Sequence, residues 1–135
     1  MTVKWFAKEV SEKILRAANT GIFRGAEAVL EEARRLILSP PKTGKIYRRR
    51  SIEHQASAPG EAPASDTGRL VQSGRTEYDR KEVLGRIIFS ANYAASLELG
   101  TLNMQPRPFA RPALAAKRDF IQQAVAEEIA IALKS

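Results

Sequence analysis

Three prolines fix the backbone of one short stretch of this 135-residue chain: Pro106, Pro108 and Pro112. Each proline fixes its own φ angle and biases the residue before it away from the helical region. Gly100, six residues upstream, tolerates the left-handed conformation that ends a helical turn. We therefore predict that residues 93–112 form a rigid strand-to-helix joint, which ends a short helical segment and places Pro112 in the first turn of the next helix.

The N-terminal part of the chain carries an amphipathic stripe. Apolar residues recur at three- and four-residue steps, with Lys, Glu and Arg on the other side. Gly21 and Gly25 each weaken a helix by about 1 kcal/mol relative to Ala, but the stripe keeps its phase across them. We predict one long helix over residues 3–38. Within it, Trp5 and Phe6 pack in the core or, alternatively, anchor on a neighbouring subunit.

Residues 68–90 are rich in strand-forming residues. The segment 83–89 is a strand, and the polar turn 79–82 before it predicts a hairpin with residues 75–78. Residues 70–73 fit either a short helix or a third strand, and the sequence leaves both open.

A second amphipathic stripe predicts a helix over residues 113–133. Its face consists of Leu114, Lys117 (through its aliphatic stem), Ile121, Val125, Ile129 and Leu133. The order of elements predicts an α+β fold in one domain, with both helices on one face of a small antiparallel sheet. Neighbouring subunits could pair the open edges of such a sheet.

Residues 39–67 are rich in Pro, Ala, Ser and Gly and show no apolar periodicity. A loop of this length is either functional or disordered in the free protein, so we predict a flexible arm that becomes ordered with a partner. Its dense charge cluster consists of Lys42, Lys45, Arg48, Arg49 and Arg50. These cations fit three roles: a solvated loop, a contact with DNA phosphates, or a contact with an acidic protein surface.

Two blocks of the sequence resemble a known family. The first is Y-A-x-x-L-E-x-G-T followed by P-R-P-F-x-R-P-A-L, within residues 93–114. The second is P-x-T-G-x-x-Y-R-R-R, residues 41–50, followed by H-Q-A-S-A-P-G-E-A-P-A-x-D-T-G-x-L, residues 54–70. Both are similar to the gene-product-ten-like tail-component family of long-tailed bacteriophages, which includes tail-completion and head–tail joining proteins.

The resemblance implies a structural role in the virion. Copies of the chain would form a ring, six-fold by analogy, at the neck between head and tail. Its partners would be the connector or stopper and the tail tube, with non-specific contact to the genomic DNA that passes through the lumen. Such a protein is made in the cytoplasm of the host bacterium and ends up in the virion neck.

We predict that the arm and the joint supply the contacts to neighbouring subunits or rings. The candidate interface residues are Tyr47, Arg48, Arg49, Arg50 and His54 in the arm, and Glu98, Thr101, Met104, Arg107, Phe109 and Arg111 in the joint. Phe109 would act as an apolar plug held between prolines. For Glu98, a capping role or an ion pair with Arg107 or Arg111 is favoured over acid–base chemistry.

The net charge of +7 and the pI near 10.1 fit an anionic partner (nucleic acid, an anionic membrane surface or an acidic protein) and equally a charge that serves solubility. They support an alternative function, a small basic protein that contacts nucleic-acid phosphates through residues 42–50.

Enzymatic chemistry finds little support in the sequence. The chain has no cysteine and one histidine. A catalytic triad of Ser51, His54 and Asp66 is strongly disfavoured, because these residues lie in the predicted flexible arm and a triad needs rigid positioning. The ligand spacing of a metal site is also missing. We therefore predict a protein that is not an enzyme, holds no cofactor and contacts no membrane.

Overall fold

The computed structural model describes residues 7–39, 42, 44, 46–49, 52–58, 61–63 and 68–134. Its first element is the helix α1 (Ala7–Leu38), which runs without interruption through Gly21 and Gly25. The prediction of one long helix is confirmed over these residues. The predicted start of the helix and the packing of Trp5 and Phe6 lie outside the described part of the chain.

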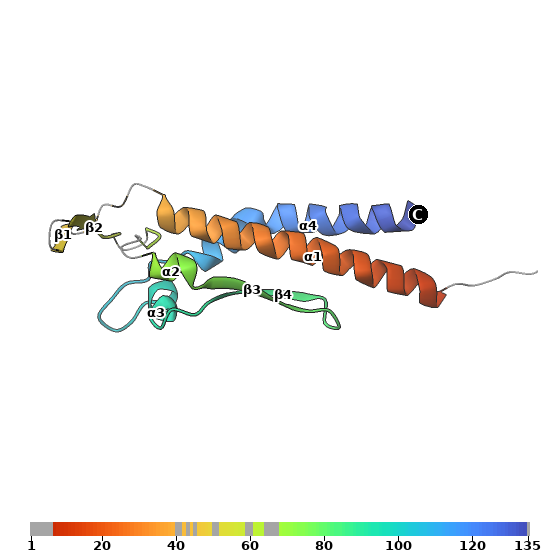
Figure 1. Ribbon diagram of the computed structural model, residues 1–135, viewed down its shortest axis with the longest axis horizontal. Helices are drawn as coiled ribbons and strands as arrows, with labels where there is room; N and C mark the ends of the chain where they lie inside the picture. Colours follow the sequence, from red (N-terminus) through yellow and green to blue (C-terminus); the bar gives the residue numbers. More distant parts are fainter. Residues whose placement is uncertain are drawn as a thin grey trace, which may run out of the picture.

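The second long helix, α4 (Ala110–Lys134), lies antiparallel beside α1 (Figure 1). A Cβ atom added at Gly21 would lie 2.5 Å from the Cα atom of Val125, and one added at Gly25 would lie 2.8 Å from Cγ1 of Ile121. These two glycines therefore let the helices approach closely, a role that their helix propensity alone does not reveal.

The predicted stripe of α4 is confirmed at its centre, where Ile121 and Val125 pack against Gly25 and Gly21 of α1. Ala113 and Ala124 are the buried residues of this helix, whereas Leu114 and Leu133 are about half exposed. The two alanines, which the predicted stripe did not include, are therefore more buried than the leucines at its two ends. The predicted stripe took the largest apolar residues to be the innermost ones.

The hairpin of β3 (Gly74–Asp79) and β4 (Leu84–Phe89) is antiparallel, as predicted. The short helix α2 (Arg69–Gln72) precedes it and decides between the two alternatives for this segment. α1 lies against both strands, and both long helices are on the same side of the hairpin (Figure 1). The α+β fold is confirmed. No helix in the described ranges is long and apolar enough to span a bilayer.

One apolar cluster joins these layers. It is formed by Val29, Ala33, Ile37, Leu70, Ala94, Phe109 and Ala113. The rings of Phe89 and Phe109 meet edge to face with centroids 4.9 Å apart, a favourable geometry for aromatic pairs. The joint therefore packs into the core instead of lying over it.

The predicted arm contains a second hairpin, formed by β1 (Ile46–Arg49) and β2 (Ile52–Gln55). It projects beyond the end of α1 (Figure 1), and among the described elements its strands contact mainly each other. This differs from the predicted arm without structure of its own. The hairpin forms through local pairing over a very short span, in which apolar periodicity gives no signal.

The base of the arm is attached to the end of α1. The ammonium group of Lys42 donates to the carbonyl oxygens of Leu36 and Ala62, each at 2.9 Å. The backbone N–H of Gly44 donates to the carbonyl oxygen of Ala56 at 2.8 Å, which brings the two sides of the arm together before β1 begins. These bonds fix the point from which the hairpin leaves the body.

Candidate assembly interface

The joint begins with α3 (Ala94–Leu99) and Gly100. Gly100 has φ 77°, and its N–H donates to the carbonyl oxygen of Ser96 at 2.8 Å. An added Cβ atom would lie 2.9 Å from the carbonyl oxygen of Met104 and equally close to Cδ of Pro106. Conformation and space both favour glycine here, which confirms the predicted left-handed position.

A tight turn follows Gly100. The N–H of Thr101 donates to the carbonyl of Met104 at 2.8 Å, and the reverse bond is 3.3 Å long. Leu102 lies at the tip of this turn and is fully exposed. The N–H of Arg107 then donates to the carbonyl of Leu97 at 2.6 Å, which ties the returning chain to α3. The hydrogen bonds thus fix the backbone of a turn that exposes the apolar side chain of Leu102 to solvent.

Glu98 caps the N-terminus of α4. One carboxylate oxygen accepts from the N–H groups of Phe109 and Ala110 at 2.8 and 3.0 Å, and the other accepts from the N–H of Arg111 at 2.9 Å. These N–H groups have no partner within the helix, and the helix dipole favours a negative charge there. The prediction of a capping carboxylate is confirmed. The bonds also explain why α4 begins three residues before the predicted position.

Phe109 is 2% exposed and packs in the core. The structure therefore corrects the prediction that this ring is presented at a subunit interface. The flanking prolines do fix the backbone, but they direct the ring inward toward Phe89 of β4.

The remaining joint residues lie nearer the surface. Thr101 and Arg111 are exposed, and Met104 and Arg107 are partly buried. The Nε atom of Arg107 is buried and has no hydrogen-bond partner among the described residues. A groove of about 430 Å³ runs along this surface, lined by Glu98, Leu99, Pro106, Pro108, Arg111, Pro112 and Ala115. The joint thus offers an apolar groove beside the exposed tip of its own turn.

The register of the arm hairpin places Tyr47 opposite His54, so two of the predicted arm residues are brought together. Arg48 lies opposite Glu53 and Arg49 opposite Ile52. The structure describes the backbone of these residues but not their side chains, and Arg50 lies outside the described residues. Their predicted contacts with other subunits stay predictions.

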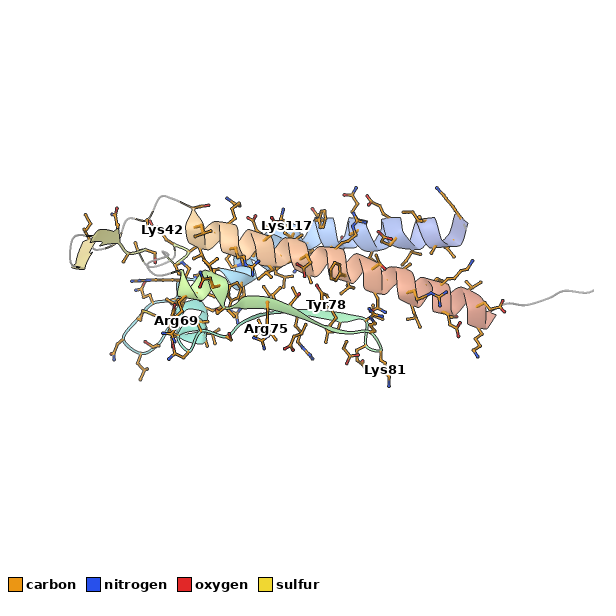
Figure 2. The ribbon with its side chains drawn as sticks, viewed as in Figure 1. Lys42, Arg69, Arg75, Tyr78, Lys81 and Lys117 are labelled. Atoms are coloured by element: carbon orange, nitrogen blue, oxygen red, sulfur yellow. The ribbon has the colours of Figure 1, made fainter. Side chains whose placement is uncertain are left out.

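Lys42 does not act as the freely exposed cation that the sequence predicts. Its ammonium group lies at the end of α1 from which the arm leaves (Figure 2) and binds two carbonyl oxygens. Burial lowers the pKa of this group from its usual value, and the nearby Glu61 opposes the shift. A lysine that holds the arm in place is not available for phosphate contacts.

Sequence reasoning missed the exposed apolar residues near the joint. Leu99 is 58% exposed and Leu102 fully exposed, and Tyr93 at the start of the joint is also exposed, as is Ile46 in the arm. The signal for Leu102 was the segment T-L-N-M directly after Gly100, a short turn with a leucine in its middle.

The described residues contain no group of acidic, histidine or cysteine side chains that could hold a metal ion. Comparison with protein-family models, with curated proteins and with solved structures found no match.

Proposed function

We propose that this chain is a structural protein of the bacteriophage virion, which forms a ring at the neck and joins or completes the tail at the head–tail interface. One observation carries the proposal beyond the sequence resemblance. The two segments that resemble the tail-component family, far apart in the chain, form the arm hairpin and the joint at the same end of the molecule (Figure 1).

A cyclic ring needs two different faces on each subunit, because its interface is heterologous and closes on itself. The joint supplies one candidate face, with an apolar groove and the exposed Leu102. The arm hairpin supplies the other, since it projects from a fixed base and makes its main contacts within itself. A preformed hairpin loses less conformational entropy on binding than a disordered loop, which favours assembly.

The mechanism is assembly, and no turnover is expected. The joint and the arm would contact the neighbouring subunits and the adjacent connector or tail-tube ring. The six-fold number follows from the resemblance alone. DNA would pass through the lumen with contacts to phosphates only.

The first test is the mass of the purified protein in solution over a range of concentration and salt, with and without a short DNA duplex. A ring, or a monomer that becomes a ring at high concentration, supports the proposal. A monomer that changes only with DNA, and loses this change in salt, supports the nucleic-acid-binding alternative instead. A monomer under every condition contradicts self-assembly into a ring.

A variant directs this test to the joint. Leu102→Asp places a charge on the exposed tip and should abolish the ring while leaving the subunit folded. Ile131→Asp is the matched control: its side chain is 63% exposed and lies near the C-terminal end of α4, at the other end of the molecule. Equal loss of the ring in both variants would contradict a specific role for the joint.

A further inference from the structure

The N-terminal half of α1 and the β3–β4 hairpin lie side by side, and their ends lie away from the arm and the joint (Figure 1). Residues of both line a hollow of about 450 Å³. It is lined by Arg16, Asn19, Thr20, Phe23, Tyr78 and Arg80. Its volume is within the range of pockets that bind small molecules. Neither the resemblance nor the proposed assembly gives this hollow a role.

The charge in the hollow is positive and unpaired. Arg16 from α1 and Arg80 from the β3–β4 turn are both exposed, and neither guanidinium has a hydrogen bond or ion pair with another described residue. By contrast, Arg24, Arg35 and Arg75 each pair with a carboxylate. No carboxylate lines the hollow among the residues that the structure describes. It is therefore complementary to an anion.

The other wall is aromatic. The rings of Phe23 and Tyr78 lie 5.2 Å apart at an angle of 36°, and the side chains are 51% and 37% exposed. The hydroxyl group of Tyr78 donates to Glu27 at 2.9 Å, which fixes this ring between the hairpin and α1 (Figure 2). A flat apolar group can therefore stack there beside the two cations.

The hollow is held in shape by its own residues. The side-chain amide of Asn19 donates to the carbonyl oxygens of Leu15 and Arg80, each at 3.0 Å. The second bond connects α1 to the β3–β4 turn and so sets the position of Arg80 relative to Arg16. Because this bond fixes the backbone of the β3–β4 turn before a ligand arrives, only the exposed side chains need to be ordered on binding.

We propose that this hollow binds a nucleotide unit, with the phosphate between Arg16 and Arg80 and the base stacked on Phe23 and Tyr78. Guanidinium groups bind phosphate oxygens in pairs, and bases stack on aromatic side chains without need for sequence recognition. An acidic peptide would satisfy the arginines but would leave the aromatic wall without a flat partner. The ligand is a free nucleotide or a nucleotide within a single strand, and the site does not depend on the ring proposal.

The test is a titration of the full chain at low salt with a nucleoside monophosphate and, separately, with a short single-stranded oligonucleotide. Calorimetry gives the affinity, and NMR follows the side-chain resonances of Asn19, Arg16 and Arg80. Both ligands should shift these resonances, and a nucleoside without phosphate should bind at least about tenfold more weakly. Tighter binding of the oligonucleotide identifies the strand as the ligand, whereas equal binding identifies the free nucleotide.

The variants separate the two parts of the hollow. Arg16→Ala and Arg80→Ala should each weaken binding about tenfold or more and reduce its salt dependence. Phe23→Leu should weaken binding about five- to a hundredfold with unchanged salt dependence, because it removes stacking and keeps the charge. Arg118→Ala is the matched control, since this exposed arginine of α4 does not line the hollow.

Four results would overturn the inference. The first is no binding of either ligand at low salt. The second is an equal loss of affinity in Arg118→Ala, which would show general attraction to a basic protein. The third is loss of binding only when Arg48, Arg49 and Arg50 are changed to Ala, which would assign the contact to the arm. A preference for an acidic peptide over both nucleotide ligands would likewise contradict it.

Discussion

Glu98 occupies a position where one side chain determines how two elements meet. Its carboxylate belongs to α3 and accepts hydrogen bonds from three consecutive N–H groups at the start of α4. Glu98→Ala leaves those donors without this partner and should lower the free energy of unfolding by about 1–3 kcal/mol. Urea denaturation followed by circular dichroism measures this change.

Two variants serve as controls for Glu98. Glu98→Gln keeps one good acceptor without the charge and should fall between the wild type and Glu98→Ala. Glu31→Ala removes an exposed carboxylate of α1 and should change stability by no more than about 0.5 kcal/mol. If Glu98→Ala is as stable as Glu31→Ala, the capping bonds contribute nothing measurable.

Tyr78 supports a prediction on pH. Burial raises the pKa of its hydroxyl group above the usual 10.0, and the neighbouring Glu27 adds to this shift. The folded state therefore holds this proton more tightly than the unfolded state. The stability that Tyr78 contributes is fully present below pH 10 and is lost as the pH rises through the raised pKa.

Tyr78→Phe tests this directly. The difference in stability between wild type and variant should be largest near neutral pH and should shrink as the pH rises above 10. Tyrosinate absorbance provides the second measurement. The part of the absorbance change that is present in the wild type and missing in Tyr78→Phe belongs to Tyr78, and it should titrate above pH 10. A component that titrates at or below pH 10 would contradict the raised pKa.

At the residue scale, the sequence predicts what depends on neighbours in the chain. Gly100 and Glu98 were predictable, because helix ends and left-handed turns have local signatures. The burial of Phe109 was not, since the prolines fix its backbone but the direction of its ring depends on where β4 and α1 lie. That arrangement arises from contacts between segments far apart in the chain.

At the scale of elements, the approach of α1 and α4 depends on two glycines. Gly21→Ala would bring a Cβ atom to 2.5 Å from the backbone of Val125, which cannot move aside without shifting the helix. We expect the overlap to lower the free energy of unfolding by about 1–3 kcal/mol. The better helix propensity of alanine offsets about 1 kcal/mol of this loss at most. Thermal or urea denaturation gives the value, and Thr20→Ala, at the exposed neighbouring position, should be close to neutral.

Gly25→Ala should differ from Gly21→Ala in one respect. Its added methyl group would meet the side chain of Ile121, 2.8 Å away, and a smaller side chain there can make room. Ile121→Ala removes both γ carbons that the added methyl group would meet, so it should recover part of the stability lost in Gly25→Ala, measured against Ile121→Ala alone, and none of that lost in Gly21→Ala. Equal recovery in both double variants would contradict these packing geometries.

The two long helices and the β3–β4 hairpin were predictable from periodicity, because their apolar faces are long enough to show a repeat. The arm hairpin was not, since four residues per strand give no clear pattern. The centre of the predicted face of α4, Ile121 and Val125, lies against α1, but Leu114 and Leu133 near its ends are about half exposed. How deeply each side chain of α4 is buried depends on where α1 and the rest of the core lie, which the periodicity of α4 alone does not give.

At the scale of the whole molecule, the arm hairpin is the part most separable from the rest. Its strands contact mainly each other, and its base is closed by the bond from Gly44 to Ala56. A loop of a few Gly and Ser residues in place of residues 46–55 can bridge that base. The body should keep its core, so we expect the melting transition to remain cooperative and its stability to change by about 0.5 kcal/mol or less.

Assembly should respond differently to the same change. If the hairpin is one of the two faces of the ring, the shortened chain should stay a monomer at concentrations where the wild type forms the ring. A second variant keeps the hairpin and changes Arg48, Arg49 and Arg50 to Ala, which separates the shape of the arm from its charge. Loss of the ring only on deletion would assign assembly to the shape of the hairpin, and loss in both variants to its cations. A ring that forms without the hairpin would show that the joint and the body suffice, and would contradict the role proposed for the arm.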